Sequence, residues 1–228
     1  MSRGLADTSI FIARESGRAL DEAKEDDRIK LVVLDLDRFL GGGQATLAEV
    51  GERIDALKKA GKPVHAYATL YTNDSYQLAS HATTIWANPM GGAMIVPTGG
   101  KNLYFGEALK KFGVTANVYR VGTFKSAVEP YLRNDQSPEA EENGLALYGD
   151  LWQAYQDEVA KARPAANLAA LTKDTAGQVE ANKGDMAQAA LALKLVDKLA
   201  TPVEFAAAMN KAMEEEPGDY PTDIAGTH

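Results

Sequence analysis

The chain has 228 residues, of which 45% are hydrophobic and 25% charged, a composition typical of folded globular proteins. Its formal net charge of -8 argues against a nucleic-acid partner, because phosphate binding requires clusters of Lys and Arg. The absence of cysteine excludes thiolate metal sites and cysteine nucleophiles, and three histidines argue against a histidine-rich metal centre.

The sequence contains no recognisable membrane or targeting segment. No apolar run approaches the roughly 20 residues of a membrane span, and the opening MSRGLADTSIFI lacks the apolar core of a signal peptide. The sequence as given therefore predicts a soluble chain. Either the protein is cytoplasmic, or the chain is a piece whose targeting segment lies upstream. Any catalysis must use hydroxyls, carboxylates, lysine or backbone amides.

The first predicted elements are a buried strand and an amphipathic helix. Residues 29–37, IKLVVLDLD, predict a strand that is buried on both faces. The following residues 44–63 place four apolar side chains at helical spacing, namely Leu47, Val50, Ile54 and Leu57. Thr46 and Glu49 have the spacing of a capping box, and Gly61 marks the end of this helix.

The alternation of strands and helices continues toward the middle of the chain. The expected elements are a strand over 64–68, a helix over 75–82, strands over 83–87 and 93–96, a helix over 102–113 and a strand over 116–121. Because the links between them are short, this order predicts an α/β domain with a largely parallel sheet.

The second half of the chain is mostly helical in pattern. Ser137, which precedes a proline, is expected to cap a helix. The next apolar residues form one stripe that we expect to pack in the core: Leu145, Tyr148, Trp152, Tyr155 and Val159. Residues 186–200 and 202–213 predict further helices. We expect a single domain over residues 1–215 and a linker-like tail over 216–228.

One lysine lies where two opposite interpretations apply. The segment YRVGTFKSAVEPYLRN, residues 119–134, places Lys125 just after a short apolar run. A catalytic base needs a neutral amine, and an ordinary lysine is almost entirely protonated near neutral pH, so such a site must be desolvated or lie near another cation. A surface lysine would instead pair with Glu129, four residues on, and remain charged. The spacing alone favours the surface interpretation.

Three glycine-rich stretches could present backbone amides to an anion or an oxyanion: LGGGQ at 40–44, MGGA at 90–93 and TGGKN at 98–102. None has the glycine spacing of a dinucleotide fingerprint or a phosphate loop, and we expect all three to form turns. Asp35 and Asp37 share a face near the end of the first strand, where α/β proteins place functional groups, although loop-facing carboxylates fit the same pattern. Local motifs therefore assemble no complete catalytic dyad.

Residues 119–155, YRVGTFKSAVEPYLRNDQSPEAEENGLALYGDLWQAY, resemble the lysine segment of the signal peptide peptidase A family, also called protease IV. The resemblance is to the long form of that family, which has two related domains in tandem. It extends over most of the chain, because residues 4–37 resemble the opening of the N-terminal domain, and SYQLASHATTIWANPMG and GDMAQAALALKLVDKLA resemble later landmarks. The lysine segment is the most specific of these.

The resemblance implies a Clp-protease/crotonase-like α/β fold, with repeated ββα units and a helical C-terminal part. It also implies a Ser-Lys peptidase that degrades cleaved signal peptides at the bacterial cytoplasmic (inner) membrane, with the catalytic part on the periplasmic side. The lysine of the family motif is the general base, which here is Lys125. It takes a proton from a serine hydroxyl, and backbone amides stabilise the oxyanion. This mechanism needs no metal and no organic cofactor.

The implied partners are the C-terminal domain of the same enzyme, further copies in a homo-oligomer, and signal peptides or other apolar peptides as substrates. Contact with a membrane would be made only through a segment that this chain lacks.

The sequence departs from the family in three ways. The nucleophilic serine of the long enzymes lies in a Gly-rich turn of the C-terminal domain, which is not part of this sequence. The corresponding turn here, TNDSYQLAS, has Asn73 at the nucleophile position and Ser75 two residues late, so Ser75 is predicted to be structural. Lys194 stands where the family landmark has glycine.

We therefore expect the chain to be the N-terminal half of such an enzyme, which supplies the base without the nucleophile and is inactive by itself. Lys125 would lack desolvation until the second domain covers it.

Two alternatives of other classes remain. The first alternative is a non-catalytic peptidase-like domain that serves as a scaffold or in assembly. It shares every core feature with the enzyme and differs only in whether Lys125 meets a serine. A second alternative is a crotonase-type acyl-CoA enzyme, since that fold also builds oxyanion holes from paired amides. The absence of a convincing Glu pair in a Gly-rich turn weighs against it.

Overall fold

The computed structural model describes residues 17–100, 102–119, 122 and 125–215. They form two compact units. The first, which we call the sheet unit, comprises the described residues up to Val96 and those from Gln156 onward. The second, which we call the lysine unit because it contains Lys125, runs from Pro97 to Tyr155.

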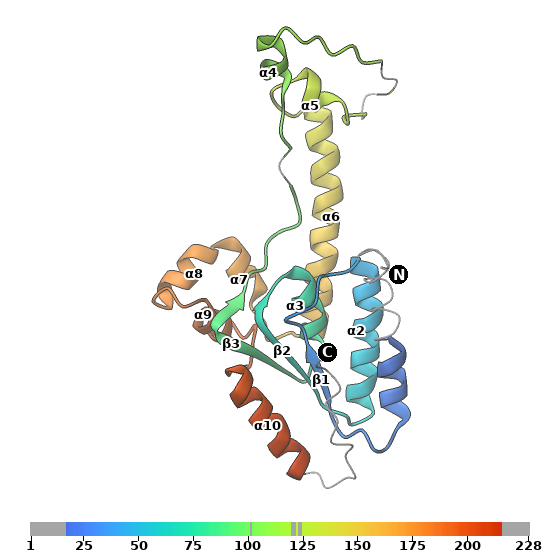
Figure 1. Cartoon of the computed structure of the whole chain (residues 1–228), viewed down its shortest axis with the longest axis vertical. Helices are drawn as coiled ribbons and strands as arrows, with labels where there is room; N and C mark the ends of the chain where they lie inside the picture. Colours follow the sequence, from blue (N-terminus) through green and yellow to red (C-terminus); the bar gives the residue numbers. More distant parts are fainter. Residues whose placement is uncertain (1–16, 101, 120–121, 123–124, 216–228) are drawn as a thin grey trace. The chain divides into compact units, whose positions relative to one another are not determined.

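The sheet unit is built around a parallel sheet, which confirms the predicted α/β class. Its strands lie in the order β1-β2-β3-β4, and each neighbouring pair is parallel (Figure 1). The strands are β1 (Val32–Asp35), β2 (Val64–Tyr71), β3 (Thr84–Ala93) and β4 (Lys198–Leu199). Helix α2 (Gln44–Lys59) connects β1 to β2, and helix α3 (Asn73–Ser80) connects β2 to β3.

The first strand differs from its prediction. It covers only Val32–Asp35, and its burial alternates along the chain, with Val33 41% exposed. The expectation of a strand over 29–37 buried on both faces is therefore wrong. The physical reason is position, because β1 pairs with β2 alone among the described strands and lies at an edge of the sheet.

Helix α2 confirms the periodicity but not the cap. Its four predicted apolar residues are all buried, and Gly61 has a φ of +82°, the left-handed conformation expected just past a helix end. However, the helix begins two residues before Thr46, its N-cap is Gly43, and no side chain caps it. The predicted capping box of Thr46 and Glu49 is therefore wrong.

Strand β3 is a single element where two strands were predicted. It runs through the MGGA stretch, so the interpretation of these glycines as a turn is wrong. A Cβ on Gly91 would lie 1.6 Å from the carbonyl oxygen of Thr69, so no side chain fits between β2 and β3. The predicted strand over 93–96 does not form beyond Ala93, although the Met94 amide still donates to Tyr71 O at 2.8 Å.

Further helices of the sheet unit are α7 (Leu168–Lys173), α8 (Thr175–Ala181), α9 (Met186–Ala192) and α10 (Pro202–Glu215). The predicted helix over 186–200 is wrong in its second half, because α9 ends at Ala192 and β4 follows. Helix α10 confirms its prediction and packs on the sheet through Phe205, whose ring stacks on Tyr67 at 4.7 Å. Helices α2 and α3 lie on the other side of the sheet (Figure 1).

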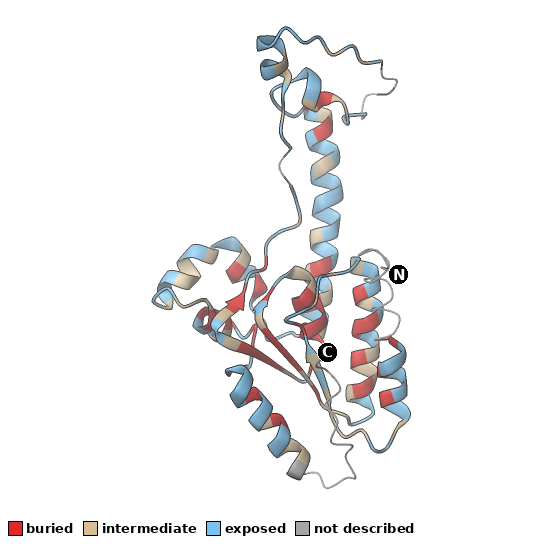
Figure 2. Cartoon of the chain, viewed as in Figure 1, coloured by how far each residue is buried: buried red, intermediate tan, exposed pale blue. Residues whose placement is uncertain are grey.

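The lysine unit contains α4 (Gly106–Lys111), α5 (Glu129–Leu132) and the start of α6 (Pro138–Ala162), which ends in the sheet unit. The predicted strand over 116–121 is wrong for its described part, because residues 114–119 form neither helix nor strand. The predicted apolar stripe is only partly core: Tyr155 and Val159 are buried, whereas Leu145 is 70% exposed. Figure 2 shows this change from exposed to buried along α6. The single domain over 1–215 stays a prediction, and the tail at 216–228 lies outside the described residues.

Candidate functional site

Lys125 lies in an irregular turn of the lysine unit and is exposed to solvent. Its backbone amide faces Gly122 O at 3.5 Å, and Gly122 has a φ of +108° that favours glycine. The two residues before Lys125, Thr123 and Phe124, lie outside the described part of the chain. The exposure of Lys125 agrees with the expectation that this chain alone does not desolvate it.

Glu129 does not stand in the helical relation to Lys125 that the surface interpretation assumed. Residues 125–128 are not helical, and α5 begins only at Glu129. The Glu129 side chain is buried, and its two oxygens accept hydrogen bonds from Ser137, one from the backbone N at 3.1 Å and one from Oγ at 2.6 Å. Ser137 Oγ also accepts from the Ala140 amide at 3.2 Å, which confirms the predicted cap at the start of α6.

The stretch TNDSYQLAS, where the sequence predicted the nucleophile turn, lies at the beginning of α3 in the sheet unit. Asn73 is the first residue of α3, and its side chain forms two hydrogen bonds with the backbone of Val96. Asn73 Nδ2 donates to Val96 O at 2.7 Å, and Asn73 Oδ1 accepts from Val96 N at 3.0 Å. Its amide therefore holds the segment that follows β3 against α3.

Ser75 has the structural role that the sequence predicted. It is buried, and its Oγ accepts from the Thr72 amide at 2.9 Å and lies 3.2 Å from Thr72 O. Thr72 and Ser75 together form a capping box for α3. The Ser75 hydroxyl is thus engaged in fixing the start of the helix.

The predicted amide and carboxylate groups near the end of β1 are hydrogen-bonded to other groups of this chain. The Gly42 amide donates to Asp74 Oδ2 at 3.1 Å, so a side chain of this chain already binds it. Asp37 accepts from the backbone N and the Oγ1 of Thr69, and Asp35 Oδ1 accepts from the Asp37 amide at 3.1 Å. These contacts support the loop-facing interpretation of Asp35 and Asp37.

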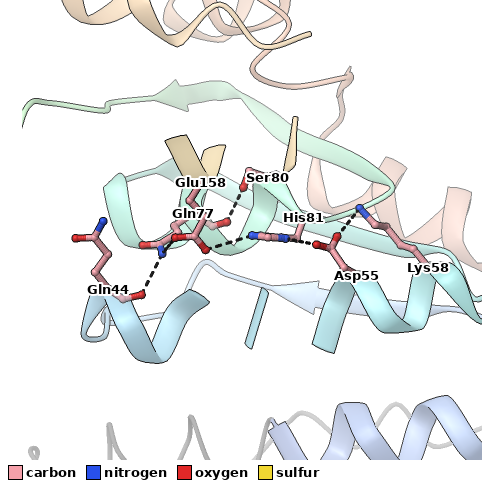
Figure 3. A network of polar contacts seen from close by, with 7 residues as sticks. All are labelled: Gln44, Asp55, Lys58, Gln77, Ser80, His81 and Glu158. Carbon is pink, nitrogen blue, oxygen red and sulfur yellow. Dashed lines mark hydrogen bonds and ion pairs between the residues drawn. The ribbon is translucent and has the colours of Figure 1, made fainter. Parts of the chain in front are cut away.

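A polar network, which sequence analysis missed, joins α2, α3 and α6 around the buried His81 (Figure 3). His81 Nδ1 lies 2.9 Å from Asp55 Oδ2, and His81 Nε2 lies 3.4 Å from Glu158 Oε1. Carboxylates only accept hydrogen bonds, so both contacts are hydrogen bonds when the ring carries both protons. The network therefore ties α3 to a carboxylate on each of two neighbouring helices.

The two ends of this network extend to further polar groups. Lys58 Nζ lies 2.9 Å from Asp55, and Gln77 Nε2 donates to Glu158 at 2.6 Å. Burial tends to raise the pKa of Asp55, but hydrogen bonds from Lys58 and His81 outweigh it and lower that pKa. Gly51 makes room for the ring, because a Cβ there would lie 2.5 Å from His81 Nε2. Glu158 lies 77 residues from His81, so no local pattern signals this contact.

The structure places the predicted residues in different units. Lys125 belongs to the lysine unit, whereas Asn73, Ser75 and the glycines at 41–43 belong to the sheet unit. Among the described residues, no group of three or more His, Asp or Glu side chains is arranged to hold a metal ion. No helix in the described part of the chain is long and apolar enough to cross a membrane.

Comparison with known protein families identifies the family of this chain. The model of peptidase family S49 matches residues 56–216, well over half of the chain. Similar proteins include Protease 4 of Haemophilus influenzae, which is 45% identical over 145 residues, or 64% of this chain and 24% of that protein. Protease 4 of Salmonella typhi is 36% identical over 209 residues, or 91% of this chain and 33% of that protein. The chain thus spans about a quarter to a third of the length of these two relatives.

Among solved structures there are also proteins whose backbones resemble that of this chain. An enoyl-CoA hydratase/carnithine racemase from Magnetospirillum magneticum has a TM-score of 0.43 at 15% identity, over 89% of this chain and 63% of that one. A putative enoyl-CoA hydratase/isomerase family protein from Hyphomonas neptunium has a TM-score of 0.42 at 16% identity, over 91% and 66%. The α/β assignment rests on the parallel sheet of this chain itself.

Proposed function

The chain belongs to peptidase family S49, a family of serine peptidases, and on this premise we propose that it supplies the general base of a Ser-Lys peptidase. Lys125 is that base. The observation that carries the proposal is the family match across residues 56–216, which includes the lysine segment by which the resemblance was first identified. The predicted resemblance to the protease IV family is confirmed by the similar proteins named Protease 4.

The proposed chemistry is a proton transfer followed by acyl transfer. The neutral amine of Lys125 removes the proton from a serine hydroxyl, whose oxygen attacks the scissile carbonyl of the peptide. Backbone amides stabilise the tetrahedral oxyanion, and the protonated lysine returns its proton to the leaving amine. The exposed position of Lys125 supports this role, because the amine is accessible to a serine outside its own unit.

We place the nucleophile in a second domain that follows this one in the whole protein. The turn that corresponds to the nucleophile turn has Asn73, whose amide is bound to Val96, and Ser75, whose hydroxyl caps α3. Neither is positioned as an activated nucleophile. The isolated chain is accordingly proposed to be inactive.

The partners follow from the same proposal. They are the C-terminal domain of the same enzyme, further copies of the protein in a homo-oligomer, and signal peptides or other apolar peptides as substrates. The proposed location is the bacterial inner membrane, with the catalytic part on the periplasmic side.

The test is peptidase activity of the protein at its natural length on an apolar fluorogenic peptide. Lys125→Ala should lower turnover by about a thousandfold or more while the variant stays folded. Lys111→Ala, which removes another exposed lysine of the same unit, is the matched control and should cleave like the wild type. Equal cleavage by all three proteins would exclude Lys125 as the base. Cleavage by none of them would favour a non-catalytic scaffold.

A further inference from the structure

The lysine unit has a buried carboxylate beside its exposed lysine. Glu129 is 2% exposed, although it lies only four residues from Lys125 in a segment with little regular structure. Removing a carboxylate from water is costly unless hydrogen bonds replace the lost solvation. We therefore expect this buried carboxylate to form hydrogen bonds that stabilise the fold of the segment.

The Glu129 side chain connects this segment to the first turn of α6. Its Oε2 accepts from the Ser137 amide at 3.1 Å, and its Oε1 accepts from Ser137 Oγ at 2.6 Å. Ser137 in turn caps α6 through the Ala140 amide, and its carbonyl oxygen accepts the Glu141 amide at 2.9 Å. The carboxylate thus lies at the positive end of the helix dipole, where negative charge is stabilised.

The Glu129 backbone connects the same residue to the Lys125 turn. The Glu129 amide donates to Ser126 O at 2.9 Å, and Ser126 is the residue directly after Lys125. Toward the C-terminus, the carbonyl oxygen of Glu129 accepts a hydrogen bond from the Arg133 amide at 2.9 Å, which closes the short helix α5. Glu129 therefore fixes the turn by its main chain and the long helix by its side chain.

We propose that Glu129 is a positioning residue, which holds the turn carrying Lys125 against the start of α6 by accepting hydrogen bonds from the backbone N and the Oγ of Ser137. The inference rests on the proposed function of Lys125 and adds the residue that sets its position. Positioning matters for a general base, because a displacement of about 1 Å from the productive geometry can cost about 100-fold in rate.

The first test concerns structure and needs no catalysis. Glu129→Gln keeps the size of the side chain but replaces one acceptor oxygen with an NH2 group, which then faces a donor of Ser137. Hydrogen exchange of the whole chain should show the amides of residues 129, 131 and 133 exchanging about tenfold faster or more. The amide of Arg163, at the far end of α6, is the internal reference and should not change. Unchanged exchange at residues 129–133 would overturn the inference.

The second test concerns turnover in the protein at its natural length. Glu129→Gln should lower kcat by about 10- to 100-fold with KM unchanged, because the base is misplaced while substrate binding is intact. Glu142→Gln, the same change at an exposed position of α6, should leave kcat unchanged. If Glu129→Gln does not fold, Ser137→Ala removes only the Oγ donor and should change exchange and kcat in the same direction, by less.

The outcomes separate this inference from the function on which it rests. Faster exchange at residues 129–133 together with wild-type kcat would show that the contact is structural only and would overturn the positioning role. Wild-type activity of Lys125→Ala would instead overturn the proposed function, and it is measured on a different variant.

Discussion

Different interactions stabilise the interior of each of the two units. The sheet unit has a dense apolar core in which Ile54, Tyr71 and Ile85 are completely buried, and its polar network around His81 lies beside that core. In the described part of the lysine unit, large apolar side chains such as Phe112 are exposed, and the buried groups include the polar pair Glu129 and Ser137 (Figure 2). Packing therefore fixes the sheet, whereas hydrogen bonds fix the turn that carries Lys125.

The largest expected effect contrasts one glycine from each unit. Gly91→Ala should destabilise the protein by more than about 4 kcal/mol, because the new Cβ would collide with the Thr69 carbonyl between β2 and β3. Gly149→Ala lies in open space on α6 and should stabilise that helix by up to about 1 kcal/mol. Urea denaturation of the two variants checks both signs. Wild-type stability of Gly91→Ala would contradict the close approach of the strands.

The next contrast concerns apolar side chains. Ile54→Ala should cost about 2–5 kcal/mol, because it leaves a cavity in the core of the sheet unit. Leu145→Ala, at an exposed position of α6, should change stability by no more than about 0.5 kcal/mol. The midpoints of urea unfolding compare them directly. A large loss for Leu145→Ala would mean that another surface covers the exposed part of α6 in solution.

A smaller effect is expected from the pH dependence of the polar network. Hydrogen bonds from Lys58 and His81 lower the pKa of Asp55 in the folded state. The stability that Asp55 contributes is therefore present above its unfolded pKa of about 3.9 and is lost as the pH falls through its lowered folded value. Asp55→Asn should be less stable than the wild type at pH 6, and the difference should shrink below about pH 4. A constant difference in thermal stability from pH 6 to pH 3 would contradict this.

The smallest predicted effect concerns a lysine in a strained conformation. Lys194 has a φ of +57° just past the end of α9, a conformation that favours glycine. Because the left-handed conformation costs a residue with a side chain about 1–2 kcal/mol, Lys194→Gly should stabilise the sheet unit by about 1 kcal/mol. Lys161→Gly, within α6, should destabilise by a similar amount. Thermal unfolding of both variants measures the opposite signs.

The difference between the units also explains which sequence predictions held. Helix α2 was predictable because Leu47, Val50, Ile54 and Leu57 repeat with the helical period and face a real core. The pattern over 116–121 predicted a strand, but the described residues 116–119 form none. The stripe beginning at Leu145 predicted a core face, but Leu145 and Tyr148 are exposed, and only its other end, at Tyr155 and Val159, is buried.

The candidate site shows the same limit in another form. Lys125 was identified from a motif, and the cap at Ser137 from local spacing. The buried role of Glu129 depends on a contact eight residues away across a turn, and His81 meets Glu158 only through the fold. Sequence patterns report neighbours along one helix or strand, whereas these contacts join separate elements.

The most direct test of the central claim replaces the proposed base chemically. The chain contains no cysteine, so Lys125→Cys introduces a single thiol here, which 2-bromoethylamine converts into a lysine analogue of lower basicity. The pH dependence of kcat/KM is then measured on the protein at its natural length, before and after alkylation. If Lys125 is the base, the unmodified variant should be inactive, alkylation should restore cleavage, and the acidic limb of the profile should move to lower pH. Full activity before alkylation, or a restored profile with an unmoved acidic limb, would contradict the account.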